Sequence, residues 1–240
     1  MPRPGNRAPD ALRPVTLSRR YLRYAEGSCL IECGGTHVLC AVSVEERQPP
    51  WMRGKEGGWI TAEYGMLPRA TKERKPREST RGKQEGRTQE IQRLVGRALR
   101  SVVKLSLLGE RTLWVDCDVI QADGGTRCAA ITGSFVALYD ACRALMDKGV
   151  LKTWPIQDHV AAVSCGLLND QPLLDLEYEE DYACAVDMNF VMTGSGRFVE
   201  IQGTAEKEPF DRASFDAMAA LGESGIRQLI GLQRDVLGLG

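Results

Sequence analysis

The pattern of apolar and polar positions is clearest between residues 111 and 146, where its period changes once. Apolar side chains first occupy every second position, as on a β-strand with one buried face: Leu113, Val115, Cys117 and Val119. They then recur every three or four residues, as on an amphipathic helix: Ile131, Phe135, Leu138, Cys142 and Leu145. The pattern therefore predicts a strand, a turn at residues 123–127 and a long helix.

The same two periods recur through most of the chain. Strands are predicted at 30–33 and 37–44 around a Gly34-Gly35 turn, and at 59–64, 160–168, 173–176, 184–192 and 198–202. Helices are predicted at 86–108, 214–221 and 223–237, and an extended lead-in at 6–15. No repeat or clear linker interrupts the pattern. We therefore expect one mixed α/β domain over residues 1–240.

Composition narrows the class of protein. Hydrophobic residues make up 43% and charged residues 26% of the chain, as in soluble globular proteins. No apolar run is long enough to cross a membrane and no signal peptide is visible, so we expect a cytoplasmic protein with no membrane partner. Eight cysteines without a Cys-x-x-Cys pair, beside two histidines, argue against a zinc site or a disulfide framework. Reduced core thiols are the expected alternative.

The net charge of −1 hides an uneven distribution of charge. Residues 1–23 carry +5, residues 69–100 carry +7, and residues 166–240 carry −9. The basic regions are suited to an anionic partner and the acidic region to a cation or a basic neighbouring subunit. The alternative is that the charges pair with one another once the chain folds.

A basic segment at 68–83 holds seven Lys and Arg residues and has no apolar periodicity. Such a segment cannot bury a core, so we expect a mobile surface loop. Because it contains no aromatic residue, it is suited to contact a phosphate backbone but not to stack bases. The alternative is a plain solvated run of charge.

The turn at Gly124-Gly125 precedes the predicted long helix and favours an anion site. Free backbone N–H groups at a helix start, beside the guanidinium of Arg127, suit a phosphate. Arg87 lies in the first turn of the helix predicted at 86–108, where a cation opposes the helix dipole. Either a bound anion or a carboxylate from elsewhere in the fold would offset that cost. The alternative for the glycine pair is a tight turn with no ligand.

Asp181 and Asp187 form the candidate acidic site. In a continuous strand they would lie roughly 20 Å apart, so the chain must leave strand conformation between 179 and 185 if both serve one site. Two carboxylates brought together bind a hard divalent cation such as Mg²⁺. The alternative is a solvated acidic turn followed by one strand aspartate satisfied by hydrogen bonds.

Taken together, these stretches resemble the bacterial ribonuclease PH family. The matching segments lie in the same order along almost the whole chain: 7–10, 25–28, 64–71, 86–94, 120–127, 175–181 and 186–189. The resemblance implies a two-layer α/β fold with βαβ units. It also implies a phosphate-dependent 3′-to-5′ exoribonuclease and tRNA nucleotidyltransferase that trims the 3′ ends of tRNA precursors and other RNA and releases nucleoside 5′-diphosphates.

The resemblance also implies roles for particular residues. These are phosphate binding by Arg87, Gly125, Thr126 and Arg127, catalysis and metal binding by Asp181 and Asp187, and RNA binding by Arg69, Arg74 and Arg77. It further implies Mg²⁺ dependence, inorganic phosphate as co-substrate, and a homohexamer built as a trimer of dimers.

Two other functions remain open at this stage. One is a non-catalytic RNA-binding subunit of an exosome-like ring, which loss of an arginine or aspartate named above would favour; none is lost. The other is a small-molecule phosphotransferase, which the absence of a Gly-x-x-x-x-Gly-Lys-Ser/Thr loop disfavours.

Overall fold

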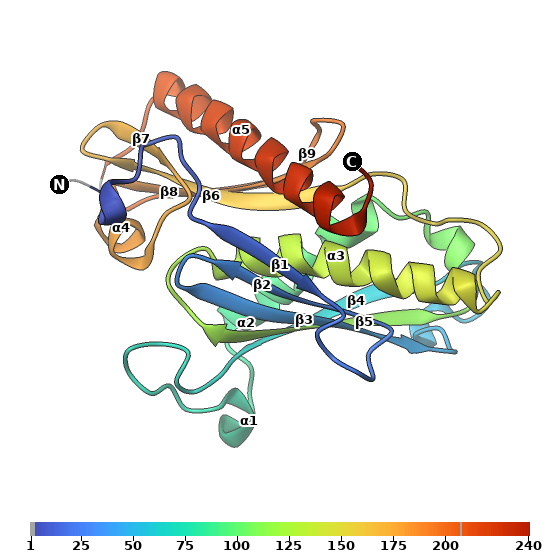
Figure 1. Cartoon of the computed structure of the whole chain (residues 1–240). Helices are drawn as coiled ribbons and strands as arrows, with labels where there is room; N and C mark the ends of the chain where they lie inside the picture. The colour runs from blue at the N-terminus through green and yellow to red at the C-terminus, as the bar shows by residue number, and fades with distance from the viewer. Residues whose placement is uncertain (1–2, 207) are drawn as a thin grey trace.

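The computed structural model describes residues 3–206 and 208–240 of the 240-residue chain. Figure 1 shows its layers from top to bottom: helix α5, a second sheet, helix α3 and a first sheet. Each sheet carries helices packed on it, and both strands and helices are abundant. The predicted mixed α/β class is confirmed.

The first sheet has the strand order β1-β2-β3-β5-β4. Its strands are β1 Val15–Arg19, β2 Gly27–Cys33, β3 Thr36–Glu45, β4 Trp59–Met66 and β5 Thr112–Gln121. The hairpin predicted around Gly34-Gly35 is confirmed, and Gly34 has the positive φ of 53° that the turn requires. β4 and β5 are parallel neighbours joined through helix α2 (Gly86–Ser101), which is a βαβ unit.

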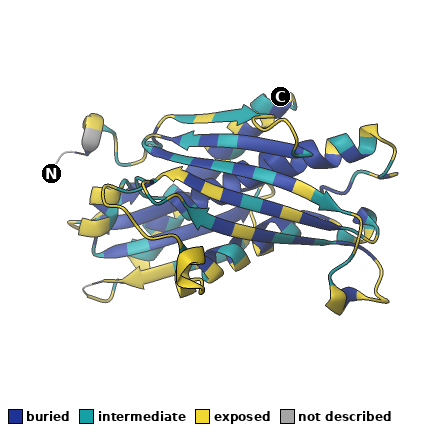
Figure 2. Cartoon of the chain, turned by 90° about the horizontal axis from the view of Figure 1, so that it is seen from below, coloured by how far each residue is buried: buried dark blue, intermediate teal, exposed yellow. Residues whose placement is uncertain are grey.

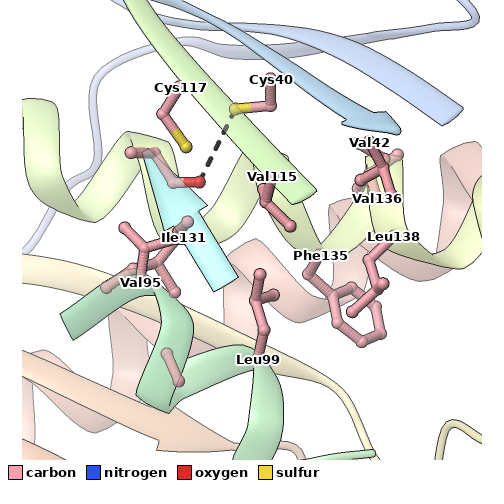
Figure 3. Packing of buried hydrophobic residues seen from close by; sticks show 14 of the residues in the cluster. Cys40, Val42, Val95, Leu99, Val115, Cys117, Ile131, Phe135, Val136 and Leu138 are labelled. Atoms are coloured by element: carbon pink, nitrogen blue, oxygen red, sulfur yellow. Dashed lines mark hydrogen bonds between the residues drawn. The ribbon is translucent and has the colours of Figure 1, made fainter. Parts of the chain in front are cut away.

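Helix α3 (Thr126–Asp147) lies between the two sheets and contacts β2, β3 and β6. Figure 3 shows its residues Ile131, Phe135 and Leu138 packed with Val115 of β5 and Leu99 of α2. By length and composition alone α3 could span a membrane, so the statement that no apolar run is long enough is wrong for this helix. Its apolar window is 89% buried inside the protein, which explains the hydrophobicity as that of a core helix.

The second sheet has the order β7-β6-β8-β9 and is antiparallel throughout. Its strands are β6 Val160–Leu168, β7 Gln171–Leu174, β8 Val186–Thr193 and β9 Phe198–Ala205. Successive residues of β6 are buried on both faces, since Ala162 packs in the core around α3 and Val163 in the core beneath α5. Figure 2 views the first sheet from its outer side and shows, by contrast, buried residues alternating with more exposed ones along its strands.

Helix α5 (Arg212–Leu237) is continuous, so the prediction of two helices separated at Gly222 is wrong. A glycine inside a helix costs stability in isolation, but here it permits close packing on the sheet. A Cβ on Gly222 would lie 2.8 Å from the ring of Phe190. Asp211 caps the helix, accepting a hydrogen bond from the Ser214 amide at 2.8 Å.

Three other predictions of local structure need correction. The helix predicted to reach residue 108 ends at Ser101, because Val103 pairs with Ile156 in a β-bridge; a 3-10 helix, η3 (Leu105–Leu108), follows. Strand β1 was missed within the stretch that follows the predicted lead-in, where it pairs with β2 along its length. The predicted strand 173–176 ends at Leu174.

The structure shows where the cysteines and the N-terminal arginines lie and what they contact. All eight cysteines are free and buried, which confirms the prediction of reduced core thiols. The basic N-terminal segment pairs with acidic partners: Arg3 with Glu180, Arg13 with Asp175 and Arg19 with Asp140. These three N-terminal arginines therefore pair with acidic residues of the same chain, which supports the alternative interpretation for this end of the chain.

Candidate active site

The glycine turn and the start of α3 are confirmed as a helix N-terminus without a side-chain cap. Gly124 and Gly125 have φ values of 74° and 65°, which only glycine adopts without strain. A Cβ on Gly124 would also lie 2.5 Å from the carbonyl oxygen of Leu176. The backbone N–H groups of the first turn have no partner within the helix, so they lie at the positive end of its dipole.

A buried ion pair between Arg13 and Asp175, which the sequence did not indicate, supports this turn. Asp175 accepts hydrogen bonds from the Arg13 amide at 2.8 Å, from Nε at 3.0 Å and from Nη2 at 2.7 Å. Arg13 also donates to the carbonyl oxygen of Asp123, and Thr36 donates to that of Gly124 at 2.6 Å. The turn is therefore fixed by partners more than 80 residues away in the chain.

The predicted departure from strand conformation is confirmed, and it takes the form of a short helix, α4 (Tyr178–Ala183). Glu177 and Glu180 form a reciprocal capping box at its start. The Glu180 carboxylate is buried and accepts Nε of Arg3 at 2.7 Å and Nη2 of Arg7 at 3.0 Å. The N-terminal arginines therefore anchor the helix that carries Asp181.

Asp181 of α4 and Asp187 of β8 come together at one site. Burial, followed by the charge of Asp181, raises the pKa of Asp187 from 3.8 to about 6. Burial also raises the pKa of Asp181, while Arg87 and Arg127 oppose the rise. Within the described part of the chain, no hydrogen bond or ion pair engages either carboxylate. Two half-buried carboxylates and two arginines thus share one electrostatic site.

The two arginines are arranged differently from one another. A bare anion clamp requires a free guanidinium, but that of Arg127 already has protein partners. Its Nη1 donates to Gln202 at 2.6 Å and lies 3.4 Å from the Glu90 carboxylate. Glu90 is on α2 one turn beyond Arg87, so this pairing lies beside the site. Arg87 is exposed, and its charge acts on both aspartates. The carboxylate explanation for its unfavourable helix position is therefore supported, and the bound-anion explanation stays a prediction.

Tyr64 and Glu206 are further members of the site that the sequence did not single out. The Tyr64 hydroxyl lies 2.8 Å from Oγ1 of Thr126, and burial raises its pKa. Glu206, just after β9, raises the pKa of both Asp181 and Asp187. Tyr64 begins one of the segments that carry the family resemblance, and that position is the only signal in the sequence that could have found it.

The site fits a hydrated divalent cation in its chemistry. Across residues 3–206 and 208–240, no group of three or more His, Cys, Asp or Glu side chains is arranged to hold a metal. Mg²⁺, however, keeps several waters and is bound through only one or two carboxylates. Asp181 and Asp187 repel each other, and neither has a competing partner among the described side chains. Those two residues would hold the ion.

The basic segment 68–83 borders the site and is less free than its sequence indicates. Arg69, Arg74 and Arg77 are exposed, but Ala70 is buried and accepts a hydrogen bond from the Ala122 amide at 2.8 Å. The expectation that this segment contributes nothing to a core is therefore wrong at Ala70. A single helical turn, α1 (Glu78–Arg81), projects below the body of the molecule in Figure 1.

This combination of fold and site defines a class of protein. A family model described as the 3′ exoribonuclease family, domain 1, matches residues 11–144, and its domain 2 counterpart matches residues 158–225. The chain therefore belongs to the 3′ exoribonuclease family, as its resemblance to the ribonuclease PH family implied.

One curated relative is similar to this chain over nearly its whole length. The chain is 58% identical to ribonuclease PH from Methylorubrum populi over 98% of this chain and 99% of the relative. Its fold is similar to rice Rrp46 (TM-score 0.80, 21% identity, 98% of this chain and 100% of the other). It is also similar to an exosome chain of Archaeoglobus fulgidus solved with RNA at the active site (TM-score 0.81, 21% identity, 95% and 91%). At that identity the two structures show the fold alone.

Proposed function

We propose that this chain is a phosphate-dependent 3′-to-5′ exoribonuclease that trims tRNA 3′ ends. The observation that carries the proposal is the convergence of an uncapped helix start at Gly125 and Thr126, the cations of Arg87 and Arg127, and the paired aspartates. Helix N–H groups and guanidinium forks bind phosphate, and they stabilise the negative charge that develops during phosphoryl transfer. Family membership and the relative from Methylorubrum populi support the same reaction.

The chemistry needs no protein nucleophile. An oxygen of inorganic phosphate, held at the α3 start by Thr126, Arg127 and Arg87, attacks the last phosphodiester of the RNA. The new P–O bond forms as the bond to the 3′ oxygen breaks, and a nucleoside 5′-diphosphate leaves. The chain contributes position and charge stabilisation. The departing 3′ oxygen takes a proton, and Asp187, with a pKa of about 6, is suited to supply it.

Mg²⁺ bound by Asp181 and Asp187 would supply charge neutralisation at the leaving oxygen. A protonated carboxylate does not bind the ion, so the two roles of Asp187 compete. Measuring kcat against pH at low and saturating Mg²⁺ separates them. If the pair binds the ion, added Mg²⁺ moves the acidic limb of the profile to lower pH. If Asp187 acts only as proton donor, kcat instead falls as pH rises through its pKa of about 6, and added Mg²⁺ leaves that alkaline limb unchanged.

RNA approach and assembly complete the proposal. The exposed arginines of the basic segment, Arg69, Arg74 and Arg77, are suited to contact the phosphate backbone.

We further assign a cytoplasmic homohexamer, built as a trimer of dimers, whose protomer is one unit over residues 1–240. The core around α3 supports a single unit, because it includes Val160, Ala162 and Val191 of the second sheet together with first-sheet residues. Sedimentation of the purified protein measures the assembly.

The deciding experiment incubates the protein with RNA and Mg²⁺, with and without phosphate. Nucleoside diphosphates formed only with phosphate support the proposal, and nucleoside monophosphates or no product contradict it. Arg127→Ala should lower kcat/KM for phosphate by about 100-fold while changing RNA affinity little, because RNA is held largely by other residues. Arg93→Ala, which removes an exposed arginine from α2 outside the site, is the matched control. Equal losses of both functions in Arg127→Ala would mean that Arg127 contacts RNA. Absence of turnover in the intact protein as well as in both variants would favour the alternative, a non-catalytic ring subunit.

A further inference from the structure

Two tyrosines of α4 expose their rings to solvent beside the acidic pair. Tyr178 is 50% exposed and Tyr182 is 82% exposed. Their ring centroids are 6.5 Å apart and their planes differ by 25°, so they form a stacked pair on one face of the helix. Leaving this much aromatic surface in water forgoes the stabilisation that burial would bring. The pair is therefore a candidate for contact with a ligand.

The position of the pair connects the basic segment to the reacting groups. Asp181 lies between the two tyrosines on the same six-residue helix. On the other side, Nζ of Lys72 lies 6.0 Å from the Tyr178 ring centroid and 2.7 Å from the Glu179 carboxylate. The Tyr178 amide donates to Asp123, just before the glycine turn, at 3.3 Å. A chain that passes from Lys72 of the basic segment to Asp181 therefore crosses these rings.

The chemistry of the pair supplies what the basic segment lacks. Arginine and lysine contact phosphates, but segment 68–83 contains no aromatic side chain and cannot stack a base. Single-stranded RNA is commonly held by both kinds of contact together. A base stacks on an aromatic face whatever its identity, so such a platform suits an exonuclease that must accept each successive nucleotide.

We propose that Tyr178 and Tyr182 form a stacking platform for a nucleobase near the 3′ end of single-stranded RNA. The inference rests on the proposed function, because it places the RNA 3′ end at the acidic pair. The open face of Tyr182 receives the base. Tyr178, whose backbone amide donates to Asp123 and whose ring lies beside Lys72, packs against the other face of Tyr182. The platform adds affinity without base preference and fixes the last nucleotides against the aspartates.

The test uses five-nucleotide RNAs in which 2-aminopurine or an abasic residue replaces one base at a time from the 3′ end. With the intact protein, 2-aminopurine fluorescence should be quenched at one or two of these positions. Tyr182→Ala should remove the quench and weaken binding about tenfold. Tyr182→Phe, which keeps the ring, should restore both, and Tyr24→Ala, in a loop near the other end of α3, is the control for an exposed tyrosine.

The abasic RNA distinguishes stacking from other effects. The intact protein should bind it about tenfold more weakly than ordinary RNA, and Tyr182→Ala should bind the two equally. An Ala variant that binds ordinary RNA as tightly as the intact protein overturns the proposal, as does one that weakens both RNAs equally. A change in assembly on Tyr182→Ala also overturns it, since the rings would then be a subunit contact. The KM for phosphate should be unchanged in all variants. Failure of the proposed function itself would appear instead as an intact protein without phosphate-dependent turnover.

Discussion

Asp187→Asn should make the protein more stable at neutral pH while abolishing turnover. The substitution keeps the size of the side chain and removes a carboxylate that the fold holds in an unfavourable setting. Burial and the neighbouring Asp181 raise the pKa of Asp187 from 3.8 to about 6, so the ionised form destabilises the folded state. The active site therefore costs the enzyme stability that the asparagine variant recovers.

The magnitude and its sign follow from proton linkage. The folded state binds this proton more tightly than the unfolded state, so the protonated carboxyl favours folding at low pH. That advantage is lost as pH rises from 3.8 through about 6, and the cost then stays constant. At 1.36 kcal/mol per pKa unit, the cost is about 2 kcal/mol at pH 5 and about 3 kcal/mol at pH 8. These are upper values, because water reaches part of the side chain and screens its charge.

The assay is urea unfolding followed by tryptophan fluorescence at pH 5 and pH 8, at one protein concentration so that assembly does not alter the comparison. The asparagine variant should gain stability over the intact protein as pH rises, and it should still bind RNA. Asp170→Asn, in the exposed turn between β6 and β7, controls for the loss of one carboxylate. A stability difference that does not change with pH, or a variant less stable at pH 8, would refute the electrostatic account of this site.

Three further perturbations test the supports around the site. Gly124→Ala should destabilise the protein by about 1–3 kcal/mol in urea unfolding, because an alanine at φ 74° is strained and its Cβ would meet the Leu176 carbonyl; an unchanged midpoint would contradict this. Replacing Arg69, Arg74 and Arg77 by Ala together should weaken binding of structured RNA and flatten its salt dependence, while phosphorolysis of short oligonucleotides survives; equal loss on both substrates would place these residues in the catalytic centre or a subunit interface. The eight thiols should resist a water-soluble disulfide reagent until urea is added, since all are buried; rapid labelling of the native protein would show otherwise.

Much of the fold could be predicted from local sequence. Alternating Leu113, Val115, Cys117 and Val119 predicted β5, and all four are buried in the structure. The start of α3 was predicted from the glycine turn, because positive φ is a local property of the backbone. The grouping of Arg87, Arg127 and the two aspartates required the family resemblance, since these residues are far apart in the chain.

What only the tertiary structure decided are the partners between distant segments. Arg13 and Asp175 are 162 positions apart, and nothing in either neighbourhood indicates that they meet. Helix α5 passes through Gly222 unbroken because Phe190 of strand β8 packs against it. Local periodicity and turn geometry depend on a few neighbouring residues, so the sequence itself determines them. Pairing, burial and the raised pKa of Asp187 depend on which surfaces the topology brings together and dehydrates, and they exist only once the whole chain has folded.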